Sequence, residues 1–196
     1  MTSPLVRIAL VAALALGASP AFAQTELSNA QIVQGLQGLT DNAPVVTVQS
    51  LRDQVMAHIN QYPGEELTRP SLALQLDKLA QINVQIQFKL GSAIIEPSSY
   101  RTLGSIADAL HNPILHGYKF IVTGNTDTTG NRMINLKLSQ ERADAVVAAL
   151  TTVFNVNPSR LSAVGLGEEV LLDPKKPTSP INRRVQIFNV GRVGPN

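Results

Sequence analysis

One stretch decides the fold: residues 121–142, with the sequence IVTGNTDTTGNRMINLKLSQER. It opens as an apolar run that predicts a strand buried on both faces, breaks at Gly124 into a turn rich in Thr, Asp and Gly, and continues into a helix. Asp127 lies in the turn and Arg142 lies well inside the helix. These two side chains can hold a zwitterion between them, because a guanidinium binds a carboxylate through a planar fork and a carboxylate binds an ammonium. We therefore expect this turn and helix to carry the functional site.

Strand and helix patterns alternate on both sides of this stretch. Strict alternation of apolar and polar residues from Ile82 to Phe88 predicts a strand with one buried face. Pro97 fits the first position of a helix, whose apolar stripe continues to Leu110. The remaining elements are expected at 118–123 (strand), 131–154 (helix), 161–164 (strand) and 185–189 (strand). This order predicts an α/β two-layer sandwich, with the helices on one face of a small mixed four-stranded sheet.

The helix expected at 131–154 carries two stripes at helical spacing. The core stripe is predicted to consist of Leu136, Ala143, Val147, Leu150 and Phe154. A second stripe, rotated by about 100°, contains Asn135, Leu138 and Arg142. This second stripe is partly polar and lies beside the turn that carries Asp127, so we expect it to face the site.

The composition excludes several classes of function. The 16 basic and 14 acidic residues give a formal net charge of +2, and aromatic residues make up 4% of the chain, so a nucleic-acid partner is not expected. The chain has no cysteine, which excludes disulfides and thiolate chemistry. None of the three histidines, His58, His111 and His116, lies in the turn, and no metal-ligand spacing is present. We therefore predict a non-catalytic protein without a metal ion or cofactor.

The first 23 residues resemble a secretory signal peptide. Arg7 supplies the positive charge, and the apolar run Ile8–Gly17 is shorter than a membrane span. Ala21 and Ala23 fit the small residues of a cleavage site, so the mature chain is expected to begin at Gln24. An uncleaved N-terminal anchor is the alternative. The pattern predicts a soluble exported protein, and we expect it in the periplasm of a bacterium.

Residues 24–80 are predicted to form an N-terminal helical extension, and residues 81–196 the main domain. The extension has one helix that begins near Ser28 and a second helix expected at 50–62. Residues 71–80 fit a strand and a helix equally well. The apolar faces of these helices must be buried, so the extension either packs on the following domain or binds an envelope protein partner.

Several motifs occur in an order and spacing similar to those of the OmpA-like domain family. The first is an aromatic residue followed by a small-residue turn, and the second is a Gly-x-Thr-Asp-x-x-Gly turn followed by Asn and by Leu-Ser-x-x-Arg-Ala. Two shorter motifs, Gly-Leu-Gly-Glu and Asn-Arg-Arg-Val, complete the pattern. In this chain they are Phe88 with Gly91-Ser92-Ala93, Gly124–Gly130 with Asn135 and Leu138–Ala143, Gly165–Glu168, and Asn182–Val185. The resemblance covers about residues 84–190.

The resemblance implies a peptidoglycan-binding domain that helps to organise the bacterial cell envelope, in association with the outer membrane or the cell wall. Its ligand would be the meso-diaminopimelate of the peptide stem, which carries an ammonium and a carboxylate on one carbon. The chemistry agrees with that of the turn and helix. The predicted peptidoglycan-binding residues are Thr126, Asp127, Asn135, Leu138, Arg142 and Arg183.

Two positions depart from the family pattern. Asn125 replaces the usual His, and Thr178-Ser179 replaces the usual Gly-Arg at the expected rim of the pocket. An envelope scaffold that acts mainly through residues 24–80 is the alternative function. Arg183 and Arg184 alternate across a strand, so only one of them can face the pocket. The resemblance assigns that place to Arg183 and leaves Arg184 exposed.

Overall fold

A computed structural model describes residues 27–38, 44–62 and 71–192, so the predicted signal peptide at 1–23 lies outside the described residues. The described ranges contain five α-helices and four strands, in the order α1, α2, α3, β1, α4, β2, α5, β3, β4. The helices are α1 (Asn29–Leu36), α2 (Val48–Gln61), α3 (Ser71–Leu76), α4 (Tyr100–Leu110) and α5 (Arg132–Thr152). The strands are β1 (Gln81–Val84), β2 (Tyr118–Asn125), β3 (Leu161–Gly167) and β4 (Arg184–Arg192).

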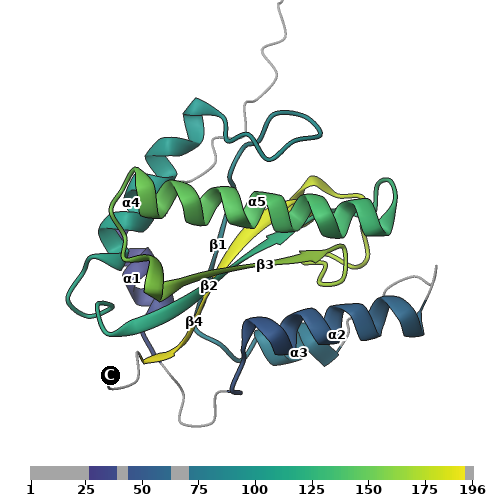
Figure 1. Cartoon of the computed structure of the whole chain (residues 1–196), viewed down its shortest axis with the longest axis horizontal. Coiled ribbons are helices and arrows are strands. Elements are labelled where there is room, and N and C mark those ends of the chain that lie inside the picture. The colour runs from purple at the N-terminus through teal and green to yellow at the C-terminus, as the bar shows by residue number, and fades with distance from the viewer. Residues whose placement is uncertain (1–26, 39–43, 63–70, 193–196) are drawn as a thin grey trace, which may run out of the picture.

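The strands form a mixed four-stranded sheet, as predicted, and their order in the sheet is β1-β4-β2-β3 (Figure 1). Strand β2 is parallel to β3 and antiparallel to β4, and β1 is antiparallel to β4. Because β2 and β4 run in opposite directions, the end of β2 lies beside the start of β4, where Asn125 pairs with Arg184. This pairing brings the turn after β2 next to residues that follow it by almost 60 positions in the chain.

Helices cover both faces of the sheet. Figure 1 shows α4 and α5 on one side, as predicted, and α2 and α3 on the other. Consecutive residues of β2 divide between the two cores: Phe120 and Val122 pack with α1, α4 and α5, whereas Ile121 packs with α2 and α3. Leu51 of α2 is completely buried in the second core. Helices α2 and α3 of the N-terminal extension therefore supply a third layer of the fold, whereas α1 packs on the side of α4.

Helix α5 lies close to the sheet along a line of small residues. A Cβ atom on Gly124 of β2 would lie 2.1 Å from the backbone oxygen of Ser139, and one on Gly165 of β3 would lie 2.4 Å from the backbone nitrogen of Gln140. The Ser139 hydroxyl accepts a hydrogen bond from the backbone nitrogen of Gly167. The Gln140 side chain also bonds the edge of β3, where it accepts from the nitrogen of Gly165 and donates to the oxygen of Ala163.

This close approach corrects the predicted core stripe of α5. The predicted Ala143 and Leu150 are buried, but Leu136, Val147 and Phe154 are only partly buried. The helix instead buries a line that includes small and polar residues: Asn135, Ser139, Ala143, Val146, Ala149 and Leu150. The helix is rotated in this way because only small side chains fit against the glycines of β2 and β3.

Two other expectations differ from the structure in a way that matters for the site. The strand predicted from Ile82 to Phe88 ends at Val84, because the chain turns away and Phe88 pairs with Ile95 in an isolated bridge. The ambiguous stretch 71–80 begins as helix α3. Within the described ranges, none of the helices is both long and apolar enough to span a bilayer.

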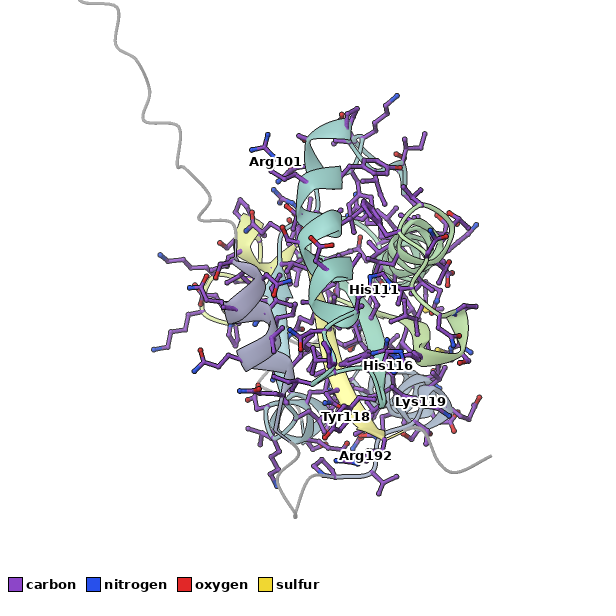
Figure 2. The ribbon with its side chains drawn as sticks, turned by 90° about the vertical axis from the view of Figure 1, so that its left-hand side faces the viewer. Arg101, His111, His116, Tyr118, Lys119 and Arg192 are labelled. Carbon is purple, nitrogen blue, oxygen red and sulfur yellow. The ribbon has the colours of Figure 1, made fainter. Side chains whose placement is uncertain are left out.

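A buried arginine fixes the opposite end of the sheet, where β2 begins. Arg160 is 5% exposed and donates to the backbone oxygens of Leu110, Leu115 and Tyr118. Figure 2 shows this end of the molecule, with Tyr118 beside Arg192. The Arg192 guanidinium lies 5.3 Å from the centre of the Tyr118 ring. These contacts hold the loop between α4 and β2, far along the strand from the predicted site.

Candidate functional site

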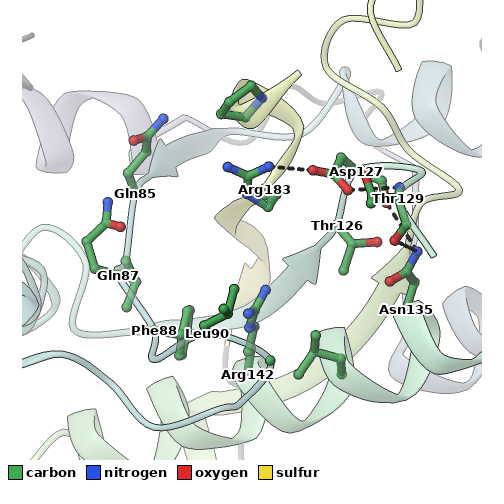
Figure 3. A pocket seen from close by; sticks show the side chains of 14 residues that line it. Gln85, Gln87, Phe88, Leu90, Thr126, Asp127, Thr129, Asn135, Arg142 and Arg183 are labelled. Carbon is green, nitrogen blue, oxygen red and sulfur yellow. Dashed lines mark hydrogen bonds and ion pairs between the residues drawn. The ribbon is translucent and has the colours of Figure 1, made fainter. Parts of the chain in front are cut away.

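A cavity of about 650 Å3 opens between the turn after β2, the helix α5, the segment after β1 and the start of β4 (Figure 3). The predicted residues converge here from three separate parts of the chain. All six line this cavity: Thr126, Asp127, Asn135, Leu138, Arg142 and Arg183. The structure therefore brings the acidic turn and the basic helix residue to one shared space.

Asp127 is held rigidly in the wall of the cavity and is only 5% exposed. Its Oδ1 atom accepts a hydrogen bond of 2.9 Å from the backbone nitrogen of Thr129, and its Oδ2 atom accepts from the guanidinium of Arg183. A carboxylate offers about four lone-pair positions, so each oxygen keeps one for a ligand. The ion pair with Arg183 also places a second cation at the cavity.

Arg142 presents the free edge of its guanidinium to the cavity. Its Nε atom donates to the backbone oxygen of Ser92 at 3.0 Å, and the guanidinium carbon lies 4.9 Å from the centre of the Phe88 ring. Among the described residues, none accepts a hydrogen bond from its two terminal nitrogens. Burial and the nearby Arg183 charge lower the pKa of Arg142, and the Asp127 charge opposes them. An arginine remains charged in a protein, so this is a fixed, planar cation with donors available for an anion.

Asn135 supports the acidic turn from behind. It is 7% exposed, and its side-chain nitrogen lies 3.3 Å from the backbone oxygen of Asp127 and 3.2 Å from that of Thr129. The same nitrogen donates to Glu168 Oε2 at 2.6 Å. Its role in this geometry is to position the turn that carries Asp127. Glu168 appeared in the family motif but was not among the predicted site residues.

Two buried polar atoms lie at the floor of the site. Thr126 lines the cavity and is 4% exposed, and its backbone nitrogen donates to the oxygen of Gly167. Asn125, at the position of the usual His, lines a much smaller cavity of about 20 Å3 beneath it. Within the described part of the chain, neither the Thr126 hydroxyl nor the Asn125 side-chain oxygen has a hydrogen-bond partner. A cavity of that size can hold about one water molecule.

The opposite wall of the cavity was not predicted. It comes from the segment that follows β1 and from the first residue of the short 3-10 turn before β4. Its side chains are amide or apolar: Gln85, Ile86, Gln87, Phe88, Leu90 and Pro180. The sequence alternates in this segment as a strand does, but nothing local shows that it crosses in front of α5. Phe88 belongs to the first motif of the family pattern, and its contact with Arg142 is the one part of this wall that the resemblance could have indicated.

Arg183 and Arg184 lie in different surroundings, although they are consecutive in the chain. Arg183 faces the cavity and pairs with Asp127, whereas Arg184 does not line the main cavity. The expectation that Arg184 is exposed is wrong, because it is 6% exposed and donates to the backbone oxygens of Val170 and Asn182. Strand β4 lies between β1 and β2 with helices on both faces, so both alternating sets of its side chains are covered.

Burial raises the pKa of Glu168 above the usual 4.5, and the hydrogen bond from Asn135 opposes this effect. The neighbouring charges of Glu169 and Asp127 raise the pKa further, while Arg132 lowers it. The folded protein therefore binds this proton more tightly than the unfolded chain. By linkage, the stabilising contribution is complete below the ordinary pKa and is lost as pH rises through the raised value.

We expect Glu168→Gln to change the pH dependence of stability. The glutamine keeps an oxygen that accepts from Asn135 but carries no charge near Glu169 and Asp127. Relative to wild type, its free energy of unfolding should increase between about pH 4 and about pH 7, because only the wild-type side chain must ionise across that range. Urea unfolding of both proteins at the two pH values measures this difference. A difference that is constant or that changes in the opposite direction would contradict the raised pKa.

The OmpA family matches residues 87–185. This match covers half of the chain and every residue that lines the cavity except Gln85 and Ile86. The chain belongs to the OmpA family. Its domain is accordingly non-catalytic, and domains of this family typically bind peptidoglycan in the cell envelope.

Relatives of this OmpA-family chain include an outer membrane porin and a probable lipoprotein from bacteria. It is 32% identical over 111 residues to outer membrane porin F of Pseudomonas fluorescens. The aligned segment covers 56% of this chain and 33% of that protein. It is 34% identical over 113 residues to the probable lipoprotein YiaD of Escherichia coli K12. That alignment covers 52% of this chain and 46% of the lipoprotein. The match thus spans less than half the length of either relative.

The fold is also similar to that of a solved structure, the periplasmic domain of Helicobacter pylori MotB. The TM-score is 0.51 at 24% identity, over 61% of this OmpA-family chain and 87% of the other. At this identity the likeness concerns the fold.

Within the described ranges, the histidine and acidic side chains form no group of three that could hold a metal ion.

Proposed function

We propose that this protein binds peptidoglycan without catalysis, through the free amino-acid end of meso-diaminopimelate in the peptide stem. The observation that carries the proposal is the shared cavity of Asp127 and Arg142. A ligand carboxylate would bind the two free terminal nitrogens of Arg142, and the ammonium on the same carbon would bind the remaining lone pairs of Asp127. Bound in this way, the protein would link the cell wall to other parts of the envelope.

The charges of the cavity support an anionic group in the ligand. Arg142 and Arg183 both face the cavity against the single negative charge of Asp127, which leaves a net positive charge among these three. The Arg183 charge helps to lower the pKa of Arg142, which means that the two cations repel each other. A carboxylate placed beside Arg142 would offset this repulsion. A ligand with only an ammonium would add a further positive charge.

The size of the cavity supports a ligand larger than the end of one side chain. Pockets of about 300–1,000 Å3 enclose whole drug-sized molecules, and this cavity is about 650 Å3. Besides the charged residues, the cavity is lined by amide and apolar side chains that include Gln87, Leu90 and Pro180. We infer that these side chains contact the peptide that continues from the diaminopimelate.

The test compares two peptides that differ by one carboxylate. The tripeptide L-alanyl-γ-D-glutamyl-meso-diaminopimelate carries both charges at its tip, whereas the same peptide with L-lysine keeps only the ammonium. Calorimetric titration should show roughly tenfold or greater preference for the first, since a hydrogen bond to a charged group contributes about 1.5–3 kcal/mol. Asp127→Asn should weaken the binding of both peptides, because both present the ammonium. Equal affinity of the wild-type protein for the two peptides would refute the proposed carboxylate contact.

We also propose that the protein acts in the periplasm after residues 1–23 have been removed as a signal peptide. The relatives support an envelope location, because their names describe an outer membrane porin, a probable lipoprotein and a periplasmic domain. Association with the outer membrane or with the cell wall would then follow from binding partners. The mature protein would then begin at Gln24, which is the first residue of the N-terminal extension at 24–80.

A protein contact through residues 24–80 is the second candidate function. The observation in its favour is an apolar groove of about 450 Å3 between α2 and α5, which Met56 and Met133 line. Both methionine side chains are more than one-third exposed. This groove is separate from the cavity of Asp127. A variant that loses peptidoglycan binding but keeps an envelope partner would distinguish the two functions.

A further inference from the structure

The end of α2 is fixed to the OmpA domain by a carboxylate that is almost completely buried. Glu169 is 1% exposed, and its two oxygens accept hydrogen bonds of 2.6 Å and 2.5 Å from Nε and a terminal nitrogen of Arg132. The Nδ1 atom of His58, near the end of α2, lies 2.6 Å from the same carboxylate. A buried charge that loses a partner is costly, so α2 is held at this point by more than apolar packing.

A second contact strengthens this attachment. The remaining terminal nitrogen of Arg132 donates to the backbone oxygen of Tyr62 at 2.5 Å, immediately after the end of α2. The rings of His58 and Tyr62 lie 5.1 Å apart, so both residues meet Arg132 as one unit. Arg132 is therefore bound on one side by the extension and on the other by Glu169.

The attachment is directly connected to the acidic turn of the cavity. Glu168 precedes Glu169 in the chain and accepts the 2.6 Å hydrogen bond from Asn135. Asn135 in turn holds the backbone of the Asp127 turn. Arg132 and Asn135 also share the first turn of α5, one residue and four residues after its capping residue Asn131. The path from α2 to the Asp127 turn thus consists of the His58–Glu169 contact, the peptide bond between Glu169 and Glu168, and the hydrogen bonds of Asn135.

We propose that Glu168, Glu169 and Arg132 are positioning residues that couple docking of α2 to the affinity of the cavity for its peptide. The proposal rests on the proposed function and adds a means of regulating it. When α2 is docked, Arg132 and Glu169 are fixed, Glu168 holds Asn135, and the Asp127 turn keeps its place. When α2 is released, Arg132 loses Tyr62 and His58, and the Glu168-Glu169 segment is free to move toward water. A protein that captured the end of α2 would therefore loosen the hold on the cell wall.

Coupling of this kind is reciprocal. If docked α2 raises the affinity for the peptide, the bound peptide must stabilise the docking of α2 by the same factor. Typical coupling factors between two sites are about 5- to 150-fold. The reciprocal effect separates a coupled site from a variant that merely damages the fold, because it is observed in the wild-type protein when ligand is added.

The experiment uses the full mature chain and the diaminopimelate tripeptide. We expect His58→Ala to weaken binding about fivefold or more, and Glu168→Ala to do the same, whereas Glu168→Gln, which keeps an acceptor for Asn135, should restore most of the affinity. Asn189→Ala is the matched control: its side chain donates to Leu36 and holds α1, so it loosens the extension at another point. This control should bind the peptide as wild type does.

Amide hydrogen exchange of α2 gives the second measurement. Adding the tripeptide should slow exchange in α2 of the wild-type protein and should have no such effect in Glu168→Ala. If the wild-type protein does not bind the tripeptide at all, the proposed function fails. If it binds, and His58→Ala and Glu168→Ala bind equally well, the coupling is overturned while the function stands. Weaker binding by the variants without slower exchange in wild-type α2 also overturns the coupling.

Discussion

Arg142→Ala is expected to lower the affinity for the diaminopimelate tripeptide by about 10- to 100-fold, because losing a charge-assisted contact costs about 1.5–3 kcal/mol. Among the described cavity residues, Arg142 is the guanidinium whose two terminal nitrogens both have no acceptor, whereas Arg183 already pairs with Asp127. The variant should also lose the preference for diaminopimelate over lysine, since the missing carboxylate contact is what distinguishes the two peptides. Calorimetric titration and co-sedimentation with purified sacculi measure both effects.

Lys137→Ala provides the matched control for this variant. Lys137 lies on the same helix, five residues before Arg142, and its side chain is 80% exposed. Its removal takes away one positive charge without touching the cavity. A thermal melt of Arg142→Ala establishes that the domain remains folded after the loss of the Ser92 and Phe88 contacts. Binding by folded Arg142→Ala within twofold of wild type would show that Arg142 is not a ligand-binding residue.

Gly124→Ala is expected to cause the largest loss of stability, about 3 kcal/mol or more, which is the upper end of overpacking effects. The added methyl would lie 2.1 Å from the backbone oxygen of Ser139. A backbone atom inside a helix cannot move aside by itself, so the whole of α5 must shift away from β2. Because α5 carries Asn135 and Arg142, the same shift would move them relative to Asp127 and weaken binding.

The control for this prediction is Gly117→Ala, at a position where an added Cβ meets nothing within 4 Å. Urea unfolding of the two variants at neutral pH compares them directly, and the control should remain close to wild type. Gly165→Ala should resemble Gly124→Ala, since its Cβ would meet the backbone of Gln140 at 2.4 Å. If Gly124→Ala unfolded at the same urea concentration as Gly117→Ala, the close packing of α5 on β2 would be wrong.

The central part of the site could be predicted because its parts are near one another in the sequence. Asp127 and Arg142 belong to one strand, turn and helix, and local patterns are enough to indicate such a unit. The family resemblance added Arg183, which pairs with Asp127 across 56 positions of the chain. The wall that contains Gln87 and Leu90 could not be predicted, because its place depends on how the chain leaves β1 and turns back at Ile95.

The rotation of α5 was missed for a different reason. Hydrophobic periodicity selects the largest apolar side chains as the buried ones, and so it favoured Leu136 and Val147. In the structure the closest contact between helix and sheet depends on the absence of side chains at Gly124 and Gly165, opposite Ser139. The spacing of large apolar residues in the sequence does not indicate a contact that depends on glycines in the facing strands. The burial of Arg184 was missed because the sequence did not indicate that helices cover both faces of β4.

The layer formed by α2 and α3 has a practical consequence for anyone who expresses only part of this protein. A recombinant fragment cut at the limits of the family match, residues 87–185, would lack both helices, all of β1 and most of β4. Its remaining strands would present Ile121, Val164 and Leu166 to water, although these side chains are at most 3% exposed in the whole chain. Such a fragment should aggregate. The unit that buries these side chains is therefore longer than the segment that matches the family.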